Sequence, residues 1–284
     1  MNKIGIIVVS YHNQHLTAQF VNQQLPKIAS HTLVVVNVDS NYESSSELAE
    51  ACGLCLVDEN HSPVSTATKF LIYDHHNIGY AKGNNKGVKF LQSLGDFDYF
   101  LFSNDDIVIE SENILNSLAQ IFLTHPDVAA VGPQIVDIDG CQQNPTNNYI
   151  SPMRKLRWKL FDFLNFHPKK ILHTNKQKLR EDYTYWVSGA FFMADAKKFL
   201  EVGGFDERTF LYYEEAILAE RFLKKQYKEF FLPSVKVQHL DGGTTKKNNS
   251  MKQLMKINKQ SSLIYYHHYR HVHPISLLFY RLFY

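Results

Sequence analysis

The first half of the chain alternates continuous apolar runs with polar, helix-like segments, and this alternation limits the folds that are open to it. The apolar runs lack the every-second-residue polarity of a strand that faces water on one side, so we expect them to be buried on both faces. They lie at residues 4–11, 32–40, 54–60, 70–76, 98–104 and 128–136, and helices are predicted at 14–29, 44–51, 82–94 and 112–124. This order predicts an α/β fold with a mostly parallel, doubly wound, Rossmann-like sheet.

Length and composition limit the classes of protein to which the chain can belong. A chain of 284 residues that is 44% hydrophobic can bury a large core, as one large α/β domain or one and a half. A net charge of +2 gives no indication of a nucleic-acid partner. Three cysteines, an odd number, favour the reducing cytosol over a disulfide framework. We interpret the first apolar run as a strand and not a signal peptide, and no run reaches the roughly 18 residues of a spanning helix.

Polar residues follow three of the predicted strands at the point where each strand ends. They are Ser10-Tyr11, Asp39-Ser40 and Asn104-Asp105-Asp106. Ligands bind at the carboxyl ends of the strands in such sheets, which predicts a shared site. A plain turn is an equal explanation for Asp39, but a weaker one for Asp105 and Asp106, because the extended pattern resumes at Ile107.

Two adjacent acids at a strand end suit Mg²⁺ or Mn²⁺ bound to substrate phosphates. Phosphoryl, nucleotidyl and glycosyl transfer all remain open on this observation. The chain contains no G-x-x-x-x-G-K-[ST] and no G-x-G-x-x-G after its first strand, which excludes P-loop enzymes and argues against Rossmann dehydrogenases.

Two further motifs carry candidate site residues. In "HNIGYAKGNNKG" (76–87), glycines at four-residue spacing allow close packing against a ligand or a strand, with Asn77, Lys82 and Asn84 as polar contacts. Glu214 and Glu215 follow an aromatic cluster, where one carboxyl with a raised pKa would suit general-base work. The competing explanation, acids that favour a helix dipole, is the stronger one when the pair is taken alone.

Residues 141–184 change in character. Between 151 and 184 there are nine Lys and Arg residues against three Asp and Glu residues, and Leu156, Leu160, Phe163 and Leu164 share one helical face. A basic amphipathic segment of this kind favours a membrane surface, and a solvated helix packed on the domain is an equal alternative. The segment 265–284 is again basic and aromatic.

Taken together and in order, seven stretches resemble a family 2 glycosyltransferase of the GT-A fold, in its bacterial rhamnosyltransferase-like branch. They are "VVSY", "VNVDS", "HNIGYAKGNNKG", "LFSNDD", "WVSGAFFM", "GGFDERTFLYYEE" and "VQHLDGG", and they span residues 4 to about 245. The resemblance implies a domain over 1–245 and a basic, helical tail over 246–284. Within the domain, 1–110 would bind the nucleotide-sugar, and 111–245, with the basic insert 141–184, would bind the acceptor.

The resemblance also implies an activity and a set of site residues. The reaction would be an inverting transfer from a dTDP- or UDP-sugar, with dTDP-rhamnose expected for this branch, to a hydroxyl of a cell-surface glycan or lipid-linked acceptor. Mn²⁺ or Mg²⁺ would be held by Asp106 and His239, and Glu215, beside Glu214, would be the general base. The implied nucleotide-sugar contacts are Ser10, Tyr11, Asp39, Asn77, Gly79, Lys82, Asn84, Asn104 and Asp105, and Trp186, Ser188 and Gly189 would face the donor sugar or the acceptor.

The sequence departs from the family pattern at three positions. Asn104 stands at the first D-x-D position, the base is Glu215 instead of Asp, and Ile217 replaces a further Asp. The Q-x-x-R-W motif of processive synthases is absent, so we expect a single addition. The expected location is cytoplasmic, at the inner face of the plasma membrane through 151–180 and 265–284. A sugar-phosphate nucleotidyltransferase and a non-catalytic sugar-nucleotide-binding relative are the alternatives.

Overall fold

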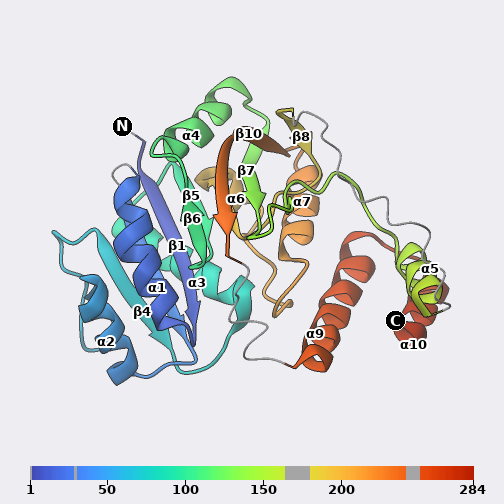
Figure 1. The fold of residues 1–284 in the computed structure, drawn as a ribbon, viewed down its shortest axis with the longest axis horizontal. Helices are drawn as coiled ribbons and strands as arrows, with labels where there is room; N and C mark the ends of the chain where they lie inside the picture. The colour runs from blue at the N-terminus through green and yellow to red at the C-terminus, as the bar shows by residue number, and fades with distance from the viewer. Residues whose placement is uncertain (1, 29–30, 164–179, 241–249) are drawn as a thin grey trace.

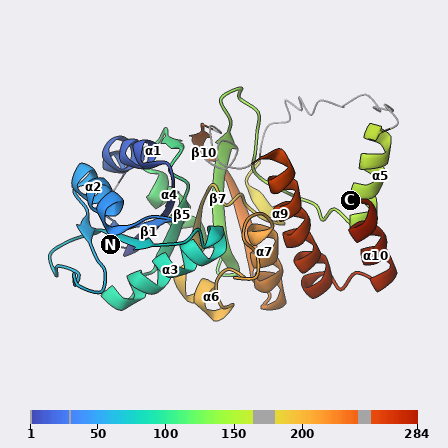
Figure 2. The same cartoon turned by 90° about the horizontal axis from the view of Figure 1, so that it is seen from below.

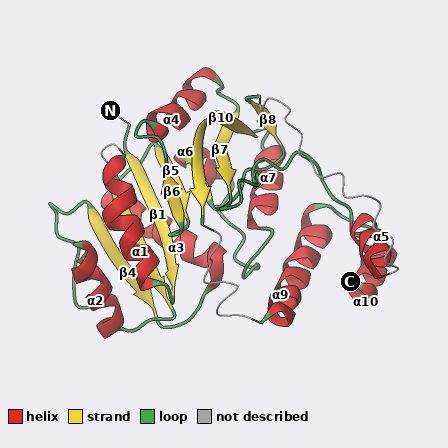
Figure 3. Cartoon of the chain, viewed as in Figure 1, coloured by secondary structure: helices red, strands yellow, loops and turns green. Residues whose placement is uncertain are grey.

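A central mixed sheet carries helices on both faces (Figures 1 and 3). The computed structural model describes residues 2–28, 31–163, 180–240 and 250–284. Within them the strands run in the order β3-β4-β2-β1-β5-β9-β7-β10-β6, and β8 pairs with β10. The strands are β1 (Ile4–Tyr11), β2 (Thr32–Val38), β3 (Cys55–Leu56), β4 (Lys69–Asp74), β5 (Tyr99–Ser103), β6 (Ile107–Ile109), β7 (Val128–Val136), β8 (Asp182–Thr184), β9 (Phe191–Asp195) and β10 (Lys228–His239).

The helices follow the predicted segments closely in the first half of the chain. The prediction for 14–29 is met by α1 (Gln14–Gln19), which continues as a π-helical turn over Phe20–Gln24 and a 3₁₀ turn over Leu25–Lys27. The others are α2 (Tyr42–Cys52), α3 (Gly79–Leu94), α4 (Ile114–Thr124), α5 (Pro152–Phe163), α6 (Ala196–Glu201), α7 (Glu214–Lys224), α9 (Met251–Ile264), the π-helical turn η3 (Tyr265–Tyr269) and α10 (Pro274–Phe283).

The predicted parallel sheet is confirmed in the part that the alternation covers. β1 pairs in parallel with β2 and β5, and β4 pairs in parallel with β2 and β3. The sheet becomes mixed beyond β5, because β9 runs antiparallel to both β5 and β7, and β10 runs parallel to β7 but antiparallel to β6. The carboxyl ends of β1, β2 and β5 therefore meet at one edge, as the polar strand ends predict.

Each face of the sheet has its own apolar core. One core joins the sheet to α1, α2 and α4, and the other joins it to α3, α6 and α7 (Figure 2). Helix α3 lies close against the strands because Gly83 and Gly87 face them: a Cβ on Gly87 would lie 2.6 Å from the Ile7 side chain. These two glycines serve helix-on-sheet packing, which was the alternative to a ligand contact.

A third apolar cluster joins the C-terminal helices to α7. Ala216 and Ile217 of α7 pack against Tyr265, Tyr266 and Tyr280, all of them buried. This cluster explains the apolar residue at position 217, because Ile217 is fully buried beneath the C-terminal extension. The predicted helical, basic extension thus contacts α7 directly. No helix in the described part of the chain combines the length and the apolar character needed to span a membrane.

We expect Ile217→Asp to detach this extension, because a carboxylate buried among tyrosines without a partner costs about 3 kcal/mol or more. Ile217→Val is the matched control and should cost about 1 kcal/mol. Urea unfolding monitored by circular dichroism measures both. Equal stability of the two variants would contradict the packing described for α7.

Candidate active site

A cavity of about 420 Å³ opens where the carboxyl ends of β1, β2 and β5 meet. Its walls come from these strand ends, the start of α3, the loop before α7 and the end of β10. The lining residues are Val9, Tyr11, Val38, Asn77, Gly79, Tyr80, Ser103, Asn104, Asp105, Asp106, Ser188, Gly189, Ala190, Phe210, Leu211, Tyr212, Tyr213, Glu214, Glu215 and His239. Residues distant in the sequence therefore share one site.

Asp106 and His239 lie together because the short strand β6, which follows Asp106, pairs with the end of β10. The Oδ1 atom of Asp106 is 3.0 Å from Nε2 of His239. The Nδ1 atom of His239 is 2.8 Å from Oε1 of Gln143, so we assign the ring proton to Nδ1, which donates to that amide oxygen. The Nε2 lone pair then faces Asp106, and the Nδ2 atom of Asn104 lies 3.3 Å from the same nitrogen.

This pair fits a divalent cation. Asp106 Oδ1 is buried and lies 3.0 Å from Nε2 of His239, so with the ring proton on Nδ1 the two atoms could bind the same ion. Carboxylate oxygen and imidazole nitrogen are ligands that Mn²⁺ accepts. No group of three or more His, Cys, Asp or Glu side chains that could hold a metal ion is found in the described ranges. The remaining ligands would be water and substrate oxygens, as is usual for Mg²⁺ at phosphate sites.

Asp105 is held from behind by a chain of hydroxyl groups. Its Oδ2 accepts a hydrogen bond of 2.7 Å from Thr17, whose Oγ1 is also 2.7 Å from the hydroxyl of Ser10. Burial raises the pKa of Asp105 to about 7, against the hydrogen bond from Thr17 and with a further increase from the charge of Asp106.

The side chain of Ser10 is not placed to contact a nucleotide, contrary to the prediction. Successive side chains of a strand point to opposite faces, and Val9 and Tyr11 line the cavity. Ser10 therefore faces the other side of the sheet, where it is fully buried against Thr17. It supports Asp105 instead.

Asp39 borders a smaller side pocket of about 270 Å³, which shares Val38 with the main cavity. Its carboxylate is 2.7 Å from Nε2 of His12, and both residues have left-handed backbone, with φ of 56° and 50°. The sequence interpretation missed His12. The signal for it was its position directly after Tyr11, at the end of the first strand.

The two carboxyl groups at the start of α7 are presented by a strained turn. Tyr212 and Tyr213 both have left-handed backbone, with φ of 73° and 71°, a conformation that costs about 1–3 kcal/mol for each non-glycine residue. The turn is held against α3, where the Tyr80 amide donates to the Phe210 carbonyl over 2.9 Å. Gly79 is required there: its φ is +79°, and a Cβ would lie 2.3 Å from the Phe210 oxygen.

Glu214 and Glu215 have different environments. Glu215 Oε1 accepts a 3.0 Å hydrogen bond from the Gly189 amide, and Tyr80 donates to the Gly189 carbonyl over 2.7 Å. Glu214 is 2% exposed, and its Oε1 has no hydrogen-bond partner among the described residues. Burial, together with the charge of Glu215, raises the pKa of Glu214 to about 8. Burial also raises the pKa of Glu215, but the Gly189 amide stabilises its anion.

The two carboxyl groups therefore differ: the Gly189 amide favours the anion of Glu215, whereas Oε1 of Glu214 has no such donor among the described residues. A carboxylate with a raised pKa beside a cavity is suited to accept a proton from a bound hydroxyl group. The Gly189 amide donates a hydrogen bond to the Glu215 carboxylate. No side chain fits at position 189, since a Cβ would lie 2.7 Å from Glu215 Oε1.

Comparison with known proteins gives curated relatives but no matching family model. N-acetylglucosaminyl-diphospho-decaprenol L-rhamnosyltransferases from two strains of Mycobacterium tuberculosis are 27% identical over 172 residues. The match covers 57% of this chain and 56% of theirs, so the chain matches a little over half the length of these relatives.

Two solved structures share the fold. GalNAc-T7, solved with UDP, GalNAc and Mn²⁺, aligns over 93% of this chain and 48% of its own, with a TM-score of 0.61 and 14% identity. The mannosyltransferase PcManGT from Pyrobaculum calidifontis, solved with GDP-Man and Mn²⁺, aligns over 99% of this chain and 69% of its own, with a TM-score of 0.58 and 13% identity. The chain has the GT-A glycosyltransferase fold. The predicted fold class is confirmed, and a rhamnosyltransferase relative agrees with the resemblance to family 2 glycosyltransferases.

Most of the predicted residues line the GT-A cavity, and a few do not. Lys82 is exposed on α3, and Asn84 is buried, with its amide donating to the Tyr80 carbonyl. Trp186 packs against the third apolar cluster and is not among the lining residues. The sequence interpretation missed Tyr80 and Gln143, whose roles depend on contacts with distant segments.

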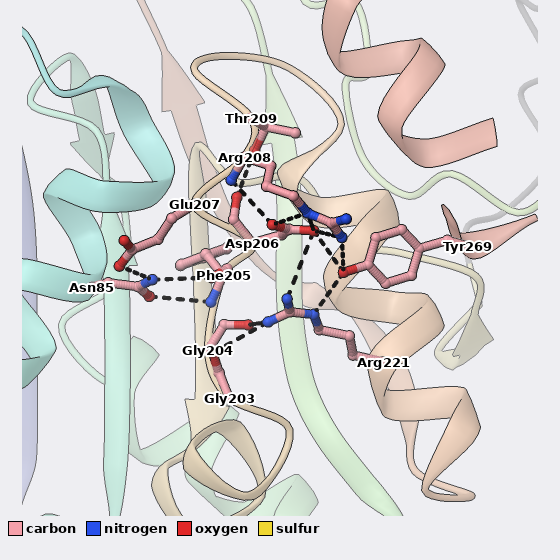
Figure 4. Close-up of polar contacts among 10 residues, drawn as sticks. All are labelled: Asn85, Gly203, Gly204, Phe205, Asp206, Glu207, Arg208, Thr209, Arg221 and Tyr269. Carbon is pink, nitrogen blue, oxygen red and sulfur yellow. Dashed lines mark hydrogen bonds and ion pairs between the residues drawn. The ribbon is translucent and has the colours of Figure 1, made fainter. Parts of the chain in front are cut away.

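A buried carboxylate fixes the loop of the GT-A site that precedes α7 (Figure 4). Asp206 is 4% exposed and accepts hydrogen bonds from Arg208 Nη2 and Tyr269 Oη, each of 2.6 Å. Arg221 of α7 lies 3.7 Å from the same carboxylate and donates to the Gly204 carbonyl over 2.7 Å. From α3, the Asn85 amide group bonds both the N–H and the carbonyl of Phe205.

These contacts determine the ionisation of Asp206. Burial alone would raise its pKa, but the hydrogen bonds from Arg208 and Tyr269 and the charge of Arg221 outweigh burial and lower the pKa to about 2. Asp206 is therefore ionised at every physiological pH. It ties the loop to α7 and, through Tyr269, to the C-terminal extension.

The raised pKa of Glu214 predicts a pH-dependent stability. Between about pH 4.5 and pH 8 the folded protein binds more protons at this site than the unfolded chain does, so stability falls as pH rises through this window. Glu214→Gln removes this term, and each pKa unit corresponds to about 1.4 kcal/mol. Thermal melts should therefore show a variant close to wild type at pH 5 and more stable than wild type at pH 8.5.

The exposed Glu50→Gln is the matched control and should leave the pH profile of the melting temperature unchanged. The assignment of the proton to Glu214 fails if the Glu214→Gln and wild-type profiles stay parallel from pH 5 to pH 9.

Proposed function

We propose that this chain is a metal-dependent, inverting glycosyltransferase that moves a sugar from a nucleotide diphosphate-sugar to an acceptor hydroxyl group. One observation carries the proposal: a single cavity is lined both by Asp106 and His239, which suit a divalent cation, and by the carboxyl pair Glu214 and Glu215. Phosphate binding and proton removal are the two requirements of this transfer. The relatives and structural neighbours, which are glycosyltransferases by name, support it.

The proposed donor is a dTDP- or UDP-sugar, with dTDP-rhamnose first. The named activity of the mycobacterial relatives is rhamnosyl transfer, and GalNAc-T7 was solved with UDP. Asp39, in the side pocket that joins the cavity at Val38, would accept from N3–H of a pyrimidine base, and His12 would shift from its present contact. Tyr11, Asn77 and Asn104 would line the path from base to sugar.

The residues of the cavity divide the chemistry between them. A divalent cation bound by Asp106 and His239 would neutralise charge on the departing diphosphate. Gln143 holds the His239 ring in the tautomer that presents Nε2. The Gly189 amide orients Glu215, which takes the proton of the acceptor hydroxyl. The oxygen of that hydroxyl attacks the anomeric carbon from the side opposite the nucleotide. Glu214, whose pKa burial raises to about 8, would stay protonated at neutral pH and leave the proton of the acceptor to Glu215.

The proposed acceptor is a hydroxyl group on a lipid-linked or cell-surface glycan. The name of the mycobacterial relatives includes a diphospho-decaprenol, a lipid-linked acceptor. We place the reaction at the cytoplasmic face of the plasma membrane, where such an acceptor would meet a nucleotide-sugar. Ser188 and Gly189, which line the cavity beside Glu215, would face the donor sugar or the acceptor.

Loss of the base should slow transfer without loss of the donor. Glu215→Gln keeps the size of the side chain and removes its basicity, so we expect kcat to fall by roughly 10²–10⁴-fold while donor affinity is maintained. Transfer is measured with radiolabelled donor, and donor affinity by calorimetry. Glu214→Gln is the matched control, since Glu214 is already protonated, and it should lose much less. Near-wild-type turnover by Glu215→Gln would exclude it as the base.

Nucleotide binding should require both the metal and Asp106. We expect UDP or dTDP with Mn²⁺ to raise the melting temperature of wild type, because a ligand at a hundredfold excess over its Kd adds about 2.7 kcal/mol. GDP and CDP with Mn²⁺ should give smaller shifts. The shift should vanish with EDTA and in Asp106→Ala, and persist in the control Asp96→Ala, which changes an exposed acid on the loop before β5.

Two activity assays beside the melting panel separate the alternatives. Release of pyrophosphate from a nucleoside triphosphate would indicate a nucleotidyltransferase. Metal-dependent binding without transfer to any hydroxyl acceptor would indicate a sugar-nucleotide-binding protein. A panel with no shift for any nucleotide would contradict the proposed donor class.

A further inference from the structure

Two helices outside the central sheet expose an unusual amount of apolar surface. α5 and α10 contact each other at the end of the molecule opposite α2 (Figures 1 and 2). Lys159 of α5 donates to the carbonyl oxygens of Phe283 and Tyr284 over 3.2 and 2.7 Å, which ties the two helices together. They form one surface, which we call the α5–α10 face.

The exposed apolar residues of α10 follow the helical period. Ile275, Leu278, Phe279, Leu282 and Phe283 are 48–65% exposed, and their spacing of three and four residues places them on one side of the helix. Tyr280 is fully buried against the third apolar cluster. The outward side of α10 is thus a continuous apolar stripe.

Helix α5 exposes apolar and cationic groups of its own. Met153, Trp158 and Leu160 are 43–54% exposed. A groove of about 510 Å³ runs along α5 and includes Met153, Arg154, Arg157 and Trp158, with the Arg154 guanidinium 4.9 Å from the centre of the Trp158 ring. Scattered exposed apolar residues are ordinary, but this many on two adjoining helices indicate a binding surface.

The charges of the face identify its partner. Helices α5 and α10 contain five Lys and Arg residues, four in the first and one in the second, against one acidic residue, Asp162. Arginine forks bind phosphate, and helices with an apolar side beside cations lie in the interface of anionic membranes. A second copy of the chain is a poorer occupant, because a twofold contact would place two faces that both carry excess positive charge against each other.

We propose that the α5–α10 face docks on a membrane leaflet that contains anionic lipids. The apolar stripe of α10 would lie at the boundary between headgroups and acyl chains, and the arginines of α5 would bind lipid phosphates. The proposal that the face binds a membrane does not depend on the proposed transferase activity. Only the purpose of that binding, access to a lipid-linked acceptor, rests on that activity.

The side chain of Lys155 links the face to the candidate active site. Lys155 of α5 points inward, bonds the hydroxyl of Tyr213 and lies 4.7 Å from the centre of its ring. Tyr213 lines the cavity and precedes Glu214. A membrane bound on the outer side of α5 would therefore be separated from the cavity by α5 itself, whose inner side contacts Tyr213 at the cavity wall.

The test is co-sedimentation of the full chain with vesicles of phosphatidylcholine, with or without phosphatidylglycerol, at low and high salt. Wild type should bind the anionic vesicles, bind the neutral vesicles far less, and be released by salt. Arg154→Gln with Arg157→Gln should weaken binding by roughly fivefold for each arginine removed. Phe279→Ser with Leu282→Ser should abolish it.

Matched controls lie on other exposed surfaces. Leu123→Ser on α4 and Lys89→Gln on α3 remove an exposed apolar group and an exposed cation and should bind as wild type does. Circular dichroism confirms folding of every variant. Wild type that stays in the supernatant with anionic vesicles, or controls that lose as much binding as the test variants, would overturn the proposal.

The outcomes distinguish this proposal from the proposed function. Docking variants should keep full transfer to a water-soluble acceptor, because no substituted residue lines the cavity. Vesicle binding by a protein that binds no nucleotide would leave docking in place and remove the transferase. A dimer in sedimentation velocity that Phe279→Ser with Leu282→Ser dissociates, without vesicle binding, would assign the face to a second copy instead.

Discussion

The geometry of the candidate active site depends on one buried ion cluster that does not line the cavity. Asp206 loses its hydration on folding, and the two arginines and the tyrosine that bind it must offset that loss. Removal of one partner from a cluster of this kind typically costs about 3–5 kcal/mol, because the remaining charge is left buried. The loop fixed in this way ends in the left-handed pair Tyr212 and Tyr213, whose strain persists because the surroundings determine it.

Some parts of the fold and the site were predictable from the sequence because local patterns determine them. Continuous apolar runs define parallel strands, and polar residues at their ends define an edge, so Asp106 and the cavity followed from short segments. Other parts depend on which strands become neighbours. The contact of Gln143 with His239, and of Tyr80 with Gly189, joins segments more than ninety residues apart that no local pattern brings together. Ser10 was misplaced because the alternation of side chains along β1 was not applied to it.

The three departures from the family pattern have structural explanations of different kinds. Ile217 fits because the C-terminal extension covers it with tyrosine rings. Asn104 lies beside His239 Nε2, where its amide can donate a hydrogen bond to the nitrogen only while that nitrogen binds no cation. Glu215 reaches the Gly189 amide with its longer side chain, which accounts for the absence of a Cβ at position 189.

The contact of Tyr269 with Asp206 bears on how far this chain can be divided into modules. Residues 250–284 follow the central sheet in the sequence, yet Tyr269 completes the bonding of the carboxylate that holds the loop before α7. In a chimera that carried this segment from a relative, the cavity would keep its shape only if the new segment also placed a tyrosine hydroxyl against Asp206. Recombination within such a family should therefore favour breakpoints that keep the loop and the extension from the same parent.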